Sequence, residues 1–162
     1  MNNGDTLKSE IEEVLQSLSA MPDRLAARSL GLDDARLNRS SAEGEWSANQ
    51  ILAHLRACAD VWGKSILAMI AQEHPTLRYV SPRTRMKKSG YAEQGFHPSL
   101  RAFTEQRNEL VRTLNALDMA GWCRRATFTG TTRGREQTVL SYAQRIAQHE
   151  DEHCTQLGTL LG

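Results

Sequence analysis

The sequence has no excess of charge of either sign. Twenty basic residues oppose nineteen acidic ones, which gives a formal net charge of +1 over 162 residues. Proteins that bind nucleic acids usually display a strongly basic surface or a basic recognition helix. The chain shows neither feature, so we expect no nucleic-acid partner.

Long apolar runs are also missing. The longest, such as Ile66 to Ala71, fall far short of the about 20 residues that span a bilayer. The polar, acidic segment from Met1 to Glu13 lacks the basic and apolar regions of a signal peptide. We therefore expect a cytoplasmic protein with no membrane partner.

Cysteine is scarce. Cys58, Cys123 and Cys154 are odd in number and widely spaced, and no C-x-x-C pair occurs. This pattern argues against a disulfide framework and against a thiolate zinc site. We expect reduced cysteines that serve as small packing residues.

The composition and length are those of a folded protein with one core. Apolar residues make up 40% of the chain and charged residues 24%, and we expect residues 1–162 to form a single domain. A 3.6-residue apolar period, typical of amphipathic helices, recurs in four segments. These segments are Leu7 to about Leu30, Ala48 to Glu73, Ser99 to Leu117, and a last one from Thr138 almost to the C-terminus. The expected fold is all-α, an antiparallel four-helix bundle.

Two long irregular segments interrupt the helical pattern. Residues 75–97 and 118–137 lack periodicity and are polar, basic and glycine-containing. We expect them to be long loops between the second and third and between the third and fourth helices. Ala126 to Thr129 is compatible with a short strand, but the sequence predicts no convincing sheet.

The start of the second helix carries the clearest boundary signal. Ser47 and Gln50 match a capping box, in which each side chain bonds the backbone N–H of the other residue. Trp46, before the cap, is placed to pack on Ile51 as a hydrophobic staple.

Histidines fall on the inward faces of the second and fourth helices. His149 and His153 are four residues apart, so their imidazoles stand one above the other on one helix face. Such a pair can bind one divalent ion, most simply zinc or nickel, which normally takes a third protein ligand. His54 is the only other histidine on an apolar helix face, whereas His74 and His97 precede prolines at helix boundaries. The alternative is that these are hydrogen-bonded core or surface histidines.

The run from His149 to His153 also matches H-E-x-x-H, the zinc metalloprotease signature. Such proteases take a third ligand downstream, from another His or a carboxylate. Residues 154–162 contain no His, Asp or Glu, which argues against a protease. Because Glu150 and Glu152 neighbour inward histidines, we expect both carboxylates to point away into solvent.

Three parts of the sequence are distinctive: the block Glu45–Leu55, an arginine in the third helix such as Arg107, and the closing run His149–His153. Together they resemble the DinB-like (DinB/YfiT) superfamily. The resemblance implies a four-helix bundle in which the same three histidines hold zinc or nickel, and it favours a homodimer. Some members of this family are transferases or isomerases that use a low-molecular-weight thiol, such as bacillithiol, mycothiol or glutathione.

The sequence leaves three functions open. A metal with three imidazole ligands keeps a position for water or a thiol, which favours a metal-dependent thiol S-transferase acting on a small molecule. The basic residues Arg83, Arg85, Lys87 and Lys88 would then hold the acidic groups of the thiol, unless they form a solvated mobile loop. Tyr142 is either a hydrogen-bond donor near the metal or a core residue. A metal-dependent hydrolase and a non-catalytic metal- or ligand-binding module are the alternatives, and no catalytic residue is identified.

Overall fold

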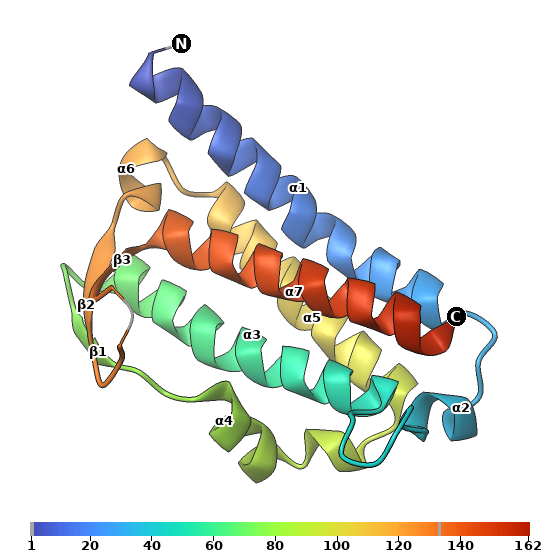
Figure 1. Ribbon diagram of the computed structural model, residues 1–162. Helices are drawn as coiled ribbons and strands as arrows, with labels where there is room; N and C mark the ends of the chain where they lie inside the picture. Colours follow the sequence, from blue (N-terminus) through green and yellow to red (C-terminus); the bar gives the residue numbers. More distant parts are fainter. Residues whose placement is uncertain (1, 133) are drawn as a thin grey trace.

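The computed structural model describes residues 2–132 and 134–162; Met1 and Arg133, the latter within the expected loop 118–137, lie outside it. Long helices dominate the structure (Figure 1). The long helices are α1 (Asn3–Ser29), α3 (Ala48–Ala71), α5 (Phe96–Asn115) and α7 (Val139–Leu161). The expected all-α four-helix bundle is confirmed. No helix in the described part of the chain is long and apolar enough to cross a membrane.

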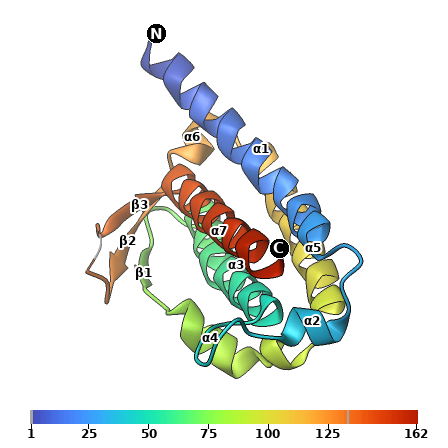
Figure 2. The same ribbon diagram turned by 45° about the vertical axis from the view of Figure 1, so that its right-hand side comes forward.

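The order of the helices around the bundle differs from their order in the sequence. α1 packs against α5 and α7, and α3 packs against the same two helices. α1 therefore lies diagonally opposite α3 in the bundle, and α5 lies diagonally opposite α7 (Figure 2). α1 and α7 run in one direction and α3 and α5 in the other (Figure 1), so the α3–α7 and α1–α5 contacts are antiparallel.

The long connections hold more structure than the sequence predicted. The expectation of no convincing sheet was wrong, because a three-stranded sheet of order β1-β2-β3 caps one end of the bundle (Figure 1). β1 pairs parallel with β2, and β2 pairs antiparallel with β3. Strands this short give too little alternation to detect, and β1 pairs with a strand that is distant in sequence. The shorter elements are α2 (Asp34–Asn38), β1 (Thr76–Arg78), α4 (Pro82–Ser89), the 3₁₀ turn η1 (Tyr91–Glu93), α6 (Met119–Trp122), β2 (Arg125–Thr129) and β3 (Glu136–Thr138).

The start of α3 is formed as the sequence predicted. Ser47 Oγ accepts a hydrogen bond from the N–H of Gln50 at 3.2 Å, and Gln50 Oε1 accepts one from the N–H of Ser47 at 2.9 Å. Trp46 packs against the apolar cluster that contains Ile51. This reciprocal cap satisfies two donors at the helix end that have no partner within the helix.

A buried ion pair joins α5 and α7 across the bundle, between two apolar clusters of the core. Glu150 accepts two hydrogen bonds from the guanidinium of Arg107, and both residues are 1% exposed. The expectation that Glu150 is solvated was therefore wrong. α7 packs against both α1 and α3, so its buried surface is wider than one stripe and includes the residue after His149.

Ser47→Ala removes one half of the capping box. We expect the free energy of unfolding to fall by about 1 kcal/mol, measured by urea denaturation. Ser40→Ala, in the exposed loop before α3, is the control and should change nothing. Equal stability of the two variants would contradict a contribution from the cap.

Arg107→Met leaves the Glu150 carboxylate buried without its partner. We expect a loss of about 3–5 kcal/mol in the free energy of unfolding, because an unpaired charge stays in the core. The double variant Arg107→Met/Glu150→Leu removes both charges and should recover most of that loss. If the double variant is no more stable than the single one, the cost arises from packing and not from the unpaired charge.

Candidate metal centre

Three histidines from α3 and α7 meet in the structure. Each of His54, His149 and His153 offers a ring nitrogen, and these atoms all lie within 4.8 Å of one another. The Nε2 atoms of His54 and His149 are 3.0 Å apart. The antiparallel α3–α7 contact thus brings together the residues chosen from the sequence, whereas His74 and His97 are not part of the group.

The donor set fits a divalent metal ion. His54 is 7% exposed, and burial, followed by the nearby charges of His153, His149 and Arg83, lowers its pKa to about 4. A neutral imidazole with a free lone pair is the form that binds metals. The Nδ1 atom of His153 lies 2.8 Å from the amide oxygen of Gln156. Because an amide oxygen can only accept a hydrogen bond, Nδ1–H of His153 is the donor, which leaves the lone pair of Nε2 available to a metal ion.

Cys58, predicted from the sequence to be a packing residue, lies beside two of the three histidines. The Sγ atom of Cys58 is 3.5 Å from Nε2 of His54 and 3.5 Å from Nε2 of His149. Burial, and then the negative charge of Glu150, raises the pKa of this thiol. The sequence contained a signal, because Cys58 follows His54 by four residues on the same inward face.

Aromatic rings and arginines surround the histidines. The Trp46 ring lies 5.0 Å from the His54 ring, and the Trp62 ring 5.0 Å from the His149 ring. The guanidinium of Arg83 lies 5.2 Å from the Trp46 ring centre, and that of Arg145 lies 4.8 Å from the Trp62 ring centre. The three histidines, Cys58, Trp62 and both arginines line one cavity of about 480 Å³. Trp46, Trp62 and Arg145 were not predicted from the sequence to lie at the site.

The basic residues expected to act together are separated by the structure. They lie on α4, so the segment is a helix and not a loop. Arg83 lines the histidine cavity, whereas Arg85 is held by Asp60 at 2.8 Å. Lys87 and Lys88 occupy the last turn of α4.

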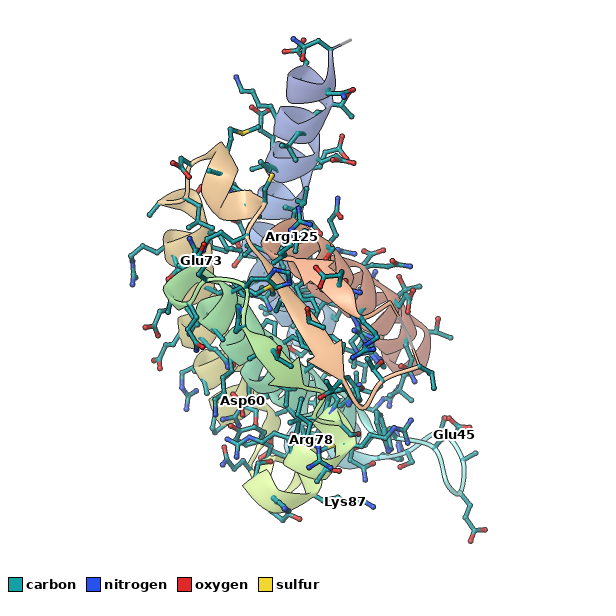
Figure 3. All side chains as sticks on the ribbon, turned by 90° about the vertical axis from the view of Figure 1, so that its left-hand side faces the viewer. Glu45, Asp60, Glu73, Arg78, Lys87 and Arg125 are labelled. Atoms are coloured by element: carbon teal, nitrogen blue, oxygen red, sulfur yellow. The ribbon has the colours of Figure 1, made fainter. Side chains whose placement is uncertain are left out.

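A second, more apolar cavity adjoins the first. It measures about 610 Å³ and shares Trp62 and Tyr79 with the histidine cavity. Asp60 and Arg78, labelled in the view of the sheet side in Figure 3, also line it. Tyr142 forms part of its wall and stacks on Phe128, with ring centres 4.9 Å apart, and burial raises the pKa of Tyr142 to about 12. The structure places Tyr142 in core packing.

The chain matches one family model and resembles solved structures. The family model, described as the DinB superfamily, matches residues 17–157. YfiT from Bacillus subtilis, described as a probable metal-dependent hydrolase with an unusual four-helix bundle topology, is similar at a TM-score of 0.74 and 18% identity, over 92% of this chain and 86% of that one. The mycothiol-dependent maleylpyruvate isomerase is similar at a TM-score of 0.71 and 17% identity, over 91% of this chain and 60% of that longer one. No curated protein sequence matches the chain. At these identities, the structural similarities establish the fold alone.

If the three histidines share one ion, removing any of them should have the same effect. We expect His54→Ala to lower bound zinc as sharply as His149→Ala or His153→Ala, measured by elemental analysis after zinc loading and dialysis. His74→Ala and His97→Ala are controls and should keep full occupancy. Full zinc content in His54→Ala would rule out the shared site.

Proposed function

The chain belongs to the DinB superfamily, and we propose that it is a metal-dependent enzyme that transfers a low-molecular-weight thiol to a small electrophilic substrate. The observation that carries this proposal is the convergence of three ring nitrogens on a cavity of about 480 Å³. Catalytic metal sites leave room for a substrate beside the protein ligands, whereas structural sites are enclosed. A histidine cluster that faces a cavity supports an enzyme over a purely structural module.

His54, His149 and His153 would hold the ion, for which zinc or nickel suits imidazole ligands. Such an ion lowers the pKa of a coordinated water or thiol and so makes a nucleophile available at neutral pH. The two histidines of α7 are half-buried and His54 is buried. The ion would therefore be reached from the α7 side of the cavity.

Arg83 and Arg145 would bind the thiol. Both line the histidine cavity, and each guanidinium lies over a tryptophan ring, which restrains its position through cation–π attraction. Guanidinium groups bind carboxylates through paired hydrogen bonds. The pair therefore suits an acidic thiol, such as glutathione or bacillithiol, more than a neutral one.

The electrophile would occupy the adjoining apolar cavity. Its wall includes Val61, Phe128 and Tyr142, and it shares Trp62 and Tyr79 with the histidine cavity. Apolar and aromatic side chains favour a substrate with a substantial apolar part. A molecule held there would lie beside the histidine cavity, because Trp62 and Tyr79 form part of both walls.

Metal-dependent hydrolysis is the second candidate. Glu152 lines the histidine cavity, where a carboxylate can accept a proton from water. Glu150 is not available for this role, because both of its oxygens are bound by Arg107. The hydrolase proposal therefore depends on Glu152, and Glu152→Gln should abolish hydrolysis without lowering zinc content.

Cobalt-substituted protein provides the test of thiol use. Adding glutathione, bacillithiol or mycothiol should change the visible spectrum, because a new ligand alters the metal coordination. Arg83→Ser and Arg145→Ser should each weaken binding of an acidic thiol about tenfold, corresponding to one lost charge-assisted hydrogen bond of about 1.5 kcal/mol. Mass spectrometry with a panel of electrophiles would then detect the thiol conjugate.

Lys87→Ser and Lys88→Ser are the matched controls, because both lysines lie on α4 and are absent from the cavity lining. Their thiol affinity should equal that of the wild type. A site that binds azide but no thiol would exclude the transferase and favour hydrolysis. A spectrum that responds to no added ligand would favour the non-catalytic module.

A further inference from the structure

We propose that Cys58 is a fourth protein ligand of the metal, so that the resting centre consists of three imidazoles and one thiolate. This inference rests on the three-histidine metal site of the proposed function. It adds a sulfur ligand to the three nitrogen ligands. It also predicts that protein side chains fill all four positions of the tetrahedral resting site.

The positions of the ligand atoms support this assignment. In a tetrahedral zinc site, bonds of 2.0–2.1 Å to nitrogen and about 2.3 Å to sulfur separate two nitrogens by about 3.3 Å and a nitrogen from the sulfur by about 3.5 Å. The Sγ atom of Cys58 lies 3.5 Å from Nε2 of His54 and 3.5 Å from Nε2 of His149. The two nitrogens are themselves 3.0 Å apart. The sulfur is thus at the separation expected of a ligand that shares an ion with both imidazoles.

The helix geometry of α3 explains how the sulfur reaches this place. His54, Cys58 and Trp62 follow one another at intervals of four, so they form a row on one helix face. His54 supplies a ring nitrogen, Cys58 lines the same cavity, and Trp62 lies against the ring of His149. One stripe of α3 therefore provides two candidate ligands and part of the cavity wall.

The other two cysteines provide a comparison, because one is a packing residue and the other lies on the surface. Cys154 is fully buried among apolar side chains of α1, α3 and α5, including Leu25, Leu55 and Phe103. Cys123 is exposed. Cys58 differs from both, because its sulfur contacts two ring nitrogens and faces the histidine cavity.

Binding of the metal would displace the thiol proton of Cys58 into solvent, and the resulting thiolate ligand would change the properties of the centre. Soft sulfur ligands select zinc over harder ions such as magnesium or manganese. The negative charge of the thiolate also offsets part of the charge of the ion. A substrate thiol must then displace Cys58 or enter as a fifth ligand.

X-ray absorption spectroscopy of the zinc-loaded wild-type chain tests the proposal directly. We expect one sulfur scatterer at about 2.3 Å together with nitrogen scatterers at about 2.0–2.1 Å. Cys58→Ala should lose the sulfur scatterer and keep its nitrogen shell, whereas Cys154→Ala should keep both. In cobalt-substituted protein, the thiolate-to-cobalt charge-transfer band should likewise be lost in Cys58→Ala alone.

The wild-type spectrum decides the question even if Cys58→Ala does not fold. A zinc site with only nitrogen and oxygen scatterers overturns the role of Cys58 and leaves the three-histidine site intact. A sulfur scatterer that persists in Cys58→Ala overturns the assignment to this residue. Failure of the wild-type chain to bind zinc overturns both this inference and the proposed metal site.

Discussion

Burial of polar groups within a helical bundle is the constraint on which this structure depends, because each such group must find a partner inside the protein. The Arg107–Glu150 pair meets this requirement across the α5–α7 diagonal for both carboxylate oxygens and for the two terminal guanidinium nitrogens, whereas Nε of Arg107 has no hydrogen-bond partner among the described residues. Each residue along a helix turns by about 100°. With Glu150 fixed toward the centre of the bundle, the preceding His149 is turned toward α3, where His54 lies. The buried ion pair thus sets the rotation of α7 that the histidine cluster requires.

The topology of the bundle also supplies the residues around the cluster. α3 and α5 run in the same direction (Figure 1), so the chain between them must return along the length of the bundle. That return segment contains α4, which packs on α3 and places Arg83 in the histidine cavity. A connection that appears irregular in the sequence therefore supplies part of the cavity wall, including Arg83.

The features that could be predicted from the sequence are those determined within one helix. The capping box at Ser47 needs only four consecutive residues, and the pairing of His149 with His153 needs only helical periodicity. The role of Glu150 could not be predicted in this way, because it depends on α7 having neighbours on two sides. The β1–β2 pairing and the separation of Arg83 from Arg85 depend on contacts between segments distant in sequence. The helical pattern places Cys58 on the same face of α3 as His54. Its proximity to His149 could not be predicted, because it depends on how α7 packs against α3.

The central claim is that α3 and α7 together hold one metal ion. Anomalous X-ray diffraction from crystals of the zinc-loaded chain, measured on both sides of the zinc absorption edge, tests it most directly. We expect one strong peak within bonding distance of ring nitrogens from His54, His149 and His153, at about 2.0–2.1 Å from each. A peak bound elsewhere, or one that contacts the α7 histidines without His54, would contradict the claim.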